Sequence, residues 1–272
     1  MRKLHYFKII VILILIVLIG GFSYLAFYHL PYAVTVSKNQ VVSSQLPEEF
    51  NQFKVGFFSD LDLKNEDDIT RLERIVTEIN AQDYDLVLFG GDLFDQQIIN
   101  NENVISQLKN IQANYGKFAV LGEKDYVNVV EVTNILELSG FEVLSNESRT
   151  IYYNNNSILL LGLESADNLD TLINSSNSGS YKIALVHQPD FFTNSINKQI
   201  NLQLSGHSHG GYIYIPFLGP LITKEGATTY NHGRYDEGSS TLLVSNGLGM
   251  ESDQSARLFC TPEITEVILS IS

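Results

Sequence analysis

Acidic and histidine side chains follow several short apolar runs of this chain, at the points where strands would end. In α/β sheets, ligands gather in the crevice beyond the carboxyl ends of the strands. Carboxylates and imidazoles that converge there form the ligand set that borderline divalent metals prefer. The sequence therefore predicts a metal site built from Asp60, Asp62, Asp92, Glu123, His187, His207 and His209.

Taken singly, these residues have ordinary explanations. An aspartate after a strand is often a helix N-cap or a turn residue, and a lone histidine such as His187 is often a hydrogen-bonded core residue. The Gly206-His207-Ser208-His209 turn is harder to explain by packing. Glycines beside the polar residues would let the backbone approach a metal or substrate closely. The order of all the pieces along the chain favours a metal site.

The segments that must position these side chains alternate between strands and helices. Apolar runs predict strands at 55–58, 86–89, 118–121, 151–153, 158–163, 183–186 and 202–205. Helical spacing predicts helices at 69–79, 104–111 and 130–139, the last one capped by Gly140. The polar stretch 174–179 is predicted to be a loop. Strands alternating with helices indicate an α/β domain.

The order of these motifs resembles the calcineurin-like metallophosphoesterase family. That family's pattern is Asp-x-His, Gly-Asp-x-x-Asp, Gly-Asn-His-Asp/Glu, a lone His and Gly-His-x-His. The corresponding stretches are 60–62 (DLD), 91–95 (GDLFD), 122–125 (GEKD), His187 and 206–209 (GHSH). The stretches 204–211, 216–220, 246–249 and 262–264 look like the membrane-associated bacterial branch. The resemblance covers the chain from about Phe53 onward.

The resemblance implies a double β-sandwich flanked by helices and a site for two divalent metals (Mn, Mg, Fe or Zn). Asp60 and His209 would bind the first metal, Asp92 would bridge the two, and His187 and His207 would bind the second. Paired cations lower the pKa of a bridging water and neutralise phosphoryl oxygens. The implied activity is hydrolysis of a phosphoester or pyrophosphate by a metal-bridging hydroxide.

Three positions depart from the family pattern. Asp62 stands in place of a histidine ligand, Glu123 in place of an asparagine ligand, and Lys124 in place of the histidine near the leaving group. Tyr212 also replaces a common glutamine. Asp62 and Glu123 keep oxygen donors, so a metal site could persist, shifted towards harder ions such as Mn²⁺ or Mg²⁺. The extra negative charge would acidify a bound water less.

Lys124 and Asp125 are the candidate catalytic residues, and Asp125, like Asp95, could instead be a supporting group. A lysine is a poor general acid at neutral pH unless its pKa is depressed. General acid–base groups contribute about 10²–10⁴ in rate, so a slow enzyme is one expectation. The alternative is a catalytically impaired pseudo-phosphoesterase that serves as a binding or regulatory protein of the cell envelope. Arg257 could meet a substrate phosphate or form an ion pair.

The formal net charge of −14 argues against nucleic-acid binding. The expected partner is a phosphorylated small molecule or a lipid-linked substrate, with no residue assigned to bind it. No feature indicates an oligomeric state. The single cysteine, Cys260, excludes an intrachain disulfide and is interpreted as a buried, inert thiol.

The N-terminus predicts a membrane anchor. Residues 1–8 are basic, with Arg2, Lys3 and Lys8, and residues 9–28 form an uncharged apolar run. About 20 such residues cross a bilayer as a helix, and the basic flank stays in the cytoplasm. We therefore expect a single-pass cell-membrane protein with a lead-in at 29–50 and a metallophosphoesterase-like domain at 51–272 outside the cytoplasm. A cleaved signal peptide is the rival interpretation.

Overall fold

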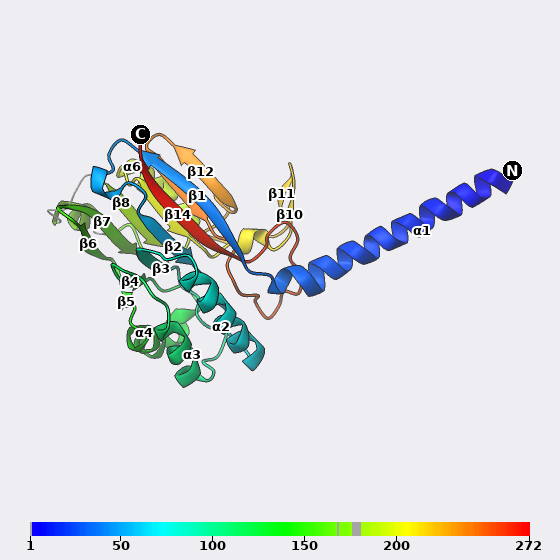
Figure 1. Cartoon of the computed structure of the whole chain (residues 1–272), viewed down its shortest axis with the longest axis horizontal. Helices are drawn as coiled ribbons and strands as arrows, with labels where there is room; N and C mark the ends of the chain where they lie inside the picture. The colour runs from blue at the N-terminus through cyan, green and yellow to red at the C-terminus, as the bar shows by residue number, and fades with distance from the viewer. Residues whose placement is uncertain (1, 168, 176–180) are drawn as a thin grey trace.

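Two six-stranded sheets packed face to face form the body of the protein. The computed structural model describes residues 2–167, 169–175 and 181–272. Figure 1 shows the two sheets as adjacent layers with helices on their outer faces, and a long N-terminal helix that leaves the domain at one end. This confirms the α/β domain that the sequence pattern predicts and the double β-sandwich with flanking helices that the family resemblance implies.

The first sheet combines four neighbouring parallel strands with the two ends of the domain. Its order is β1-β14-β2-β3-β4-β5, in which β14 is parallel to β1 and antiparallel to β2. The bounds are β1 Thr35–Ser43, β14 Glu263–Ile271, β2 Lys54–Phe58, β3 Leu86–Phe89, β4 Lys117–Ala119 and β5 Glu142–Val143.

The second sheet also has a parallel centre, where β7, β8, β9 and β13 run in the same direction. Its order is β12-β13-β9-β8-β7-β6, and the two edge strands are antiparallel to their neighbours. The bounds are β12 Gly233–Glu237, β13 Ser240–Val244, β9 Leu202–Ser205, β8 Lys182–Val186, β7 Asn156–Leu163 and β6 Glu147–Tyr153. A separate hairpin joins β10 Tyr214–Ile215 to β11 Gly219–Pro220.

Side-chain alternation along the strands divides the core into layers. On β3, Leu86 and Leu88 face the second sheet, whereas Val87 and Phe89 face the helices. The helices of the first sheet are α2 Glu66–Asn80, α3 Asn101–Lys109 and α4 Val129–Leu138. Those of the second are α5 Leu169–Ser175 and α6 Phe192–Asn197. Short 3₁₀ turns lie at Leu30–Tyr32, Glu48–Phe50, Asp125–Asn128, Pro189–Phe191 and His209–Gly211.

The helix α2 shows why the sequence pattern predicts these elements. Its apolar residues recur at helical spacing and pack on the first sheet. The Asn65 side chain accepts a hydrogen bond from the Asp68 amide at 3.0 Å and so caps the first turn. Two other elements end two residues earlier than predicted, α3 at Lys109 and β4 at Ala119.

The C-terminal region contains strands that the sequence did not predict, namely β12, β13 and β14. The segment 29–50, predicted as a lead-in, contains β1, which pairs with β14 along nine residues. Of the predicted loop 174–179, Asn174 and Ser175 end α5, and the remainder lies outside the described residues.

The N-terminal helix α1 spans Arg2–Tyr24 and continues as a π-helical turn over Leu25–His29. Within the apolar stretch His5–Tyr32, an 18-residue window has a mean hydropathy of 2.9, and 6% of that window is buried in the protein. Ala26 is the point of attachment, because it is buried and its carbonyl accepts a hydrogen bond from the Arg257 amide at 2.9 Å. By length and composition this helix could cross a membrane.

Candidate metal centre

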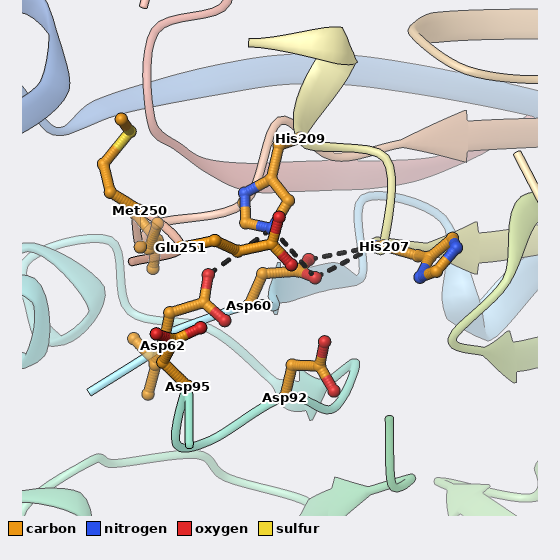
Figure 2. A network of polar contacts seen from close by, with 12 residues as sticks. Asp60, Asp62, Asp92, Asp95, His207, His209, Met250 and Glu251 are labelled. Atoms are coloured by element: carbon orange, nitrogen blue, oxygen red, sulfur yellow. Dashed lines mark hydrogen bonds and ion pairs between the residues drawn. The ribbon is translucent and has the colours of Figure 1, made fainter. Parts of the chain in front are cut away.

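The predicted site residues converge at one edge of the sandwich, beyond the carboxyl ends of parallel strands. Asp60 and Asp62 follow β2, Asp92 follows β3, and Glu123 lies in the loop after β4. The three histidines come from the other sheet, with His187 directly after β8 and His207 and His209 after β9. Figure 2 shows Asp60, Asp62 and Asp92 directed into one space, with the His209 ring above them.

The backbone at the site is held in an uncommon conformation. Asp60, Asp62, Asp92, His207 and His209 all have positive φ, between 45° and 68°. Non-glycine residues adopt this left-handed region rarely, and such strain clusters at functional sites. Glycines also allow close approach: a Cβ at Gly122 would overlap the Asp92 carboxylate, and one at Gly206 would overlap that of Asp60. The local fold is therefore shaped around these side chains.

His187 and His207 each use one ring nitrogen as a donor to a backbone carbonyl. His187 Nδ1 lies 2.6 Å from the Gly90 carbonyl, and His207 Nε2 lies 2.6 Å from the Glu225 carbonyl. Because a carbonyl can only accept, these contacts place the proton of each neutral ring there. The lone pairs of the two other nitrogens then face Glu123, at 2.7 Å from His187 Nε2 and 2.8 Å from His207 Nδ1.

These contacts create a position for a cation between the histidines and the carboxylates. His187 Nε2 is also 3.4 Å from Asp92 Oδ2, and within the described part of the chain both atoms are buried without a hydrogen-bond partner. Candidate ligand atoms lie within 4.8 Å of one another in two groups, Glu123–His187–His207 and Asp60–Asp92–His187. A divalent ion fits this donor set of imidazoles and carboxylates. Each ring also has an outer contact, a hydrogen bond from the nitrogen that faces away from the site, as metal-binding histidines usually do.

Lys124 lies among carboxylates next to Asp92. Its Nζ is 2.6 Å from Asp62 Oδ1, 2.7 Å from Glu251 Oε1 and 3.3 Å from Asp95 Oδ1. It is also 3.9 Å from Asp92 Oδ2, and only 16% of its side chain is exposed. The backbone amide of Lys124 donates to Asp92 Oδ1 at 3.0 Å. The ammonium group is therefore a fixed positive charge within the site.

His209 has a different outer contact from the other two histidines. Its Nδ1 is 3.1 Å from Nη2 of Arg257, which can only donate, so the proton of the neutral ring belongs on Nε2. Nε2 faces Asp62 Oδ2 at 3.4 Å and Asp60 Oδ1 at 3.7 Å. Tyr212 stacks on the ring, with centroids 4.6 Å apart, and its hydroxyl donates to Glu251.

The charges in the site shift the pKa values of its members. Burial raises the pKa of Asp62 to about 7, although Lys124 opposes the shift. Burial would lower the pKa of Lys124, but the carboxylates of Asp62, Asp92 and Glu251 outweigh it and raise that pKa. Burial would likewise lower the pKa of His187, but Asp92 and Glu123 raise it well above its ordinary value. The pocket beside His187 therefore favours a cation, whether a proton or a metal ion.

Asp125 supports the ligands and does not face the open site. It is buried, and its carboxylate accepts hydrogen bonds from the backbone amides of Asp92, Leu93 and Gly122 at 2.8–2.9 Å. These bonds fix the loop that presents Asp92. Asp95 is likewise a supporting residue, because it contacts Lys124 and the Ser252 hydroxyl. Of the two predicted catalytic residues, only Lys124 therefore lies among the predicted ligands.

A cavity of about 530 Å³ opens beside the histidine side of the centre. Glu123 and His187 form one wall, and Tyr126, Phe191 and Asn194 contribute to the rest. Asp190 also lines it, with its carboxylate held by the amides of Thr228, Thr229 and Tyr230. A volume of this size suits a small-molecule group placed next to the predicted metal position.

Three charged residues of the centre, Lys224, Glu251 and Arg257, were not predicted as metal-binding or catalytic residues, although Arg257 was a candidate to meet a substrate phosphate. Glu251 binds both Lys124 and Lys224, at 2.7 and 2.8 Å. Arg257 is fully buried and does not line the cavity, and among the described residues no carboxylate lies within 4 Å of it. It donates instead to the carbonyls of Asn246, Gly249 and Cys260 and to His209. No short motif marks these residues, because they come from two loops far along the chain, Lys224 between β11 and β12 and Glu251 and Arg257 between β13 and β14.

Residues 53–211 match the model of the calcineurin-like phosphoesterase family. The chain belongs to this family. The uncharacterized metallophosphoesterase YkuE of Bacillus subtilis is 32% identical over 258 residues, 90% of this chain and 88% of that protein. An uncharacterized metallophosphoesterase of Aquifex aeolicus is 28% identical over 93% of this chain and 97% of its own length. Members of the family typically bind two divalent metals.

Other relatives and solved structures are more distant. A zebrafish protein named transmembrane protein with metallophosphoesterase domain is 24% identical over 85% of this chain, which covers 56% of its length. Protein TT1561 of Thermus thermophilus has a TM-score of 0.47 at 14% identity, and the match covers 72% of this chain and 90% of that structure.

Proposed function

We propose that this protein is a membrane-anchored, metal-dependent phosphoesterase that hydrolyses a phosphoester or a pyrophosphate. The observation that supports it most is the pair of histidines whose free nitrogens face Glu123 beside Asp92. A calcineurin-like phosphoesterase with such a donor set next to an open cavity has the parts that phosphoryl hydrolysis requires.

The chain's own residues would divide the work as follows. Asp92, Glu123, His187 and His207 would hold the metal, which when bound supplies an activated water and polarises phosphoryl oxygens. Gly90 and Glu225 orient the two histidine rings through their carbonyls. Lys124 would place a positive charge beside the phosphoryl group as negative charge develops there. Its raised pKa makes it an electrostatic group and not a proton donor at neutral pH.

The N-terminal helix supports a location at the membrane, with the domain outside the cytoplasm. The basic residues Arg2, Lys3 and Lys8 lie in the first two turns of the helix α1, whose side chains from His5 to Tyr24 are exposed. Such a flank remains in the cytoplasm. The substrate class within reach of the domain is then a phosphorylated group, free or lipid-linked, at the extracytoplasmic surface of the membrane.

Paired carboxylate variants test the proposed activity. The full-length protein in detergent would be assayed with Mn²⁺ on a chromogenic phosphodiester, a phosphomonoester and inorganic pyrophosphate. We expect Asp92→Asn to lose at least about 10²-fold in turnover, because it removes a ligand between the two sides of the site. Asp170→Asn, whose carboxylate forms an exposed ion pair with Lys198, is the matched control and should retain activity. Equal turnover in the two variants would contradict the proposal.

A second candidate function is a pseudo-phosphoesterase that binds a phosphorylated ligand or a partner in the cell envelope. The observation in its favour is the Lys124 ammonium, which is engaged by Asp62 and Glu251 instead of facing the cavity. The same assay separates the two functions. Metal binding without turnover on any of the three substrates would favour the binding protein.

A further inference from the structure

The outer contacts of the three histidines divide the centre into two unequal halves. His187 and His207 donate to carbonyls and offer lone pairs to a metal. His209 accepts from Arg257, so its Nε2 has the proton. For that nitrogen to bind a metal while the Arg257 contact persists, the ring would have to become an imidazolate anion. His209 is therefore unsuited to ligate a metal in this arrangement.

The half of the centre that contains His209 already has a cation, the Lys124 ammonium. Lys124 Nζ lies within hydrogen-bond distance of Asp62, Glu251 and Asp95, which matches the three protons that an ammonium group can donate. The two compact groups of potential ligands both contain His187. Among residues 2–167, 169–175 and 181–272, neither Asp62 nor His209 belongs to such a group.

We propose that this protein binds one divalent ion, at the His187 side, and that the Lys124 ammonium takes the place of the other. The ammonium neutralises Asp62 and Glu251 and stands close to Asp92, as a metal at that position would. The Arg257 contact keeps the proton of His209 on Nε2, which faces Asp62 Oδ2 at 3.4 Å and Asp60 Oδ1 at 3.7 Å. The inference rests on the proposed function in that it assumes a metal at the His187 side.

Metal stoichiometry tests the inference without reference to activity. The full-length protein in detergent would be saturated with Mn²⁺, freed of excess ion, and analysed by elemental analysis and electron paramagnetic resonance. We expect one Mn²⁺ per chain and the six-line spectrum of an isolated ion. Two ions per chain with a spin-coupled spectrum would overturn the inference but leave the proposed function standing. No bound ion would overturn both.

A matched lysine pair tests the role of Lys124 directly. Lys124→Met removes the ammonium and leaves its carboxylate partners without a counter-charge, so we expect a second, weaker Mn²⁺ to bind. Lys198→Met removes a lysine from an exposed ion pair with Asp170, and this variant should still bind one Mn²⁺ per chain. A Lys124→Met protein that still binds a single Mn²⁺ would contradict the replacement. If this variant does not fold, the wild-type stoichiometry alone decides.

A different observation supports a second inference, which concerns the hairpin of β10 and β11. Its side chains are unusually exposed for apolar residues: Phe217 is 105% exposed, Leu218 82% and Leu221 61%. The base of the hairpin is joined to the segment that holds the N-terminal helix, because Ile213 pairs with Leu258 and Arg257 bonds Ala26. Figure 1 shows the hairpin at the end of the domain from which α1 leaves.

We infer that this hairpin inserts its apolar tip into the interface of the same bilayer that α1 crosses. Tyr24, Tyr28 and Tyr32 are exposed around the attachment point, as aromatic residues at a membrane–water interface are. The tip is thus at the depth of the membrane surface, and a lipid interface would cover its exposed apolar side chains. This inference rests on the proposed membrane anchor.

A fluorescent label on the hairpin tests the insertion. Leu218→Cys in the full-length chain would be labelled with an environment-sensitive dye in vesicles, since the only native cysteine, Cys260, is buried. We expect blue-shifted emission that shallow nitroxide lipids quench. Val130→Cys, on an exposed face of α4, should show water-like emission and no quenching.

Three outcomes would overturn the insertion. Water-like emission at position 218 in protein that floats with the vesicles would contradict the insertion alone. Blue-shifted emission that nitroxide lipids do not quench would indicate that another copy of the chain covers the hairpin. Protein that does not float with lipid would contradict the anchor as well.

Discussion

At the scale of single residues, the chemistry of this centre depends on which ring nitrogen of each histidine has the proton. The Gly90 and Glu225 carbonyls leave His187 and His207 with lone pairs, whereas the Arg257 guanidinium leaves His209 with a proton on the inner nitrogen. Outer contacts of this kind tune metal affinity by about 10–100-fold. One family motif would therefore provide a ligand at His207, whereas its second histidine, His209, keeps a proton on the nitrogen that faces the site.

We predict that the histidines differ in their effect on metal affinity. His187→Ala removes a ligand and should weaken Mn²⁺ binding by more than about 100-fold, a larger effect than the loss of an outer contact. His209→Asn should weaken it by less than about 10-fold, because His209 acts only through Asp60 and Asp62. Isothermal titration of Mn²⁺ into the two variants measures the difference. Comparable losses would show that His209 is a ligand.

Glu251 predicts a pH dependence of stability in metal-free protein. Burial would raise its pKa, but Lys224 and Lys124 lower it to about 2, from 4.5 for an ordinary glutamate. The unfolded chain then binds the proton more tightly, so the stabilisation is present above pH 4.5 and is lost as the pH falls towards 2. We expect Glu251→Gln to cost on the order of 2 kcal/mol at pH 7.

The chain has no tryptophan, so unfolding of these proteins would be followed by circular dichroism. The difference in stability between wild type and Glu251→Gln should shrink as the pH falls from 4.5 to 2. A difference that is the same at pH 3 and pH 7 would contradict the assignment of Glu251 as the counter-charge of the two lysines.

At the scale of elements, the strand ends and the loops that follow them set the geometry of the site. The β4 loop approaches Asp92 so closely that a Cβ at Gly122 would overlap its carboxylate. Gly122→Ala should therefore cost about 1–3 kcal/mol of stability and weaken metal binding, because Asp92 must move. Gly20→Ala, with open space around it, is the control. Unchanged melting temperature and metal affinity in Gly122→Ala would contradict this view of the loop.

The elements next to the motifs could be predicted from the sequence, and the distant ones could not. Strands such as β2 and β3 are short apolar runs ended by Asp60 and Gly90, so local pattern suffices. The strand β14 lies between β1 and β2, and this order depends on pairing between the two ends of the domain. The outer contacts of His207 and His209 come from Glu225 and Arg257, which no local spacing connects to them.

At the scale of the whole molecule, the α1 helix and the domain share one attachment at Ala26 and Arg257. This places the exposed apolar hairpin and the N-terminal helix at the same end of the protein. If the chain is anchored there, its hydrolytic centre works beside a membrane surface, where a lipid-linked phosphate would be concentrated.

Membrane topology is a prediction at this scale. A reporter enzyme that is active only outside the cytoplasm would be fused to the C-terminus. We expect it to be active, because residues 1–8 are basic and remain inside. Intact mass of the purified chain should include the N-terminal helix if it is a retained anchor. A cytoplasmic reporter would contradict the orientation, and a mass lacking residues 1–28 would identify a cleaved signal peptide.

The most direct test of the central claim is a metal titration of turnover. Metal-free full-length protein would receive Mn²⁺ in steps while bound metal and hydrolysis of the best of the three substrates are measured together. We predict no turnover without metal and a rise that reaches its plateau when one equivalent is bound. Bound metal with no turnover at any stoichiometry would contradict the account of this centre as a phosphoesterase.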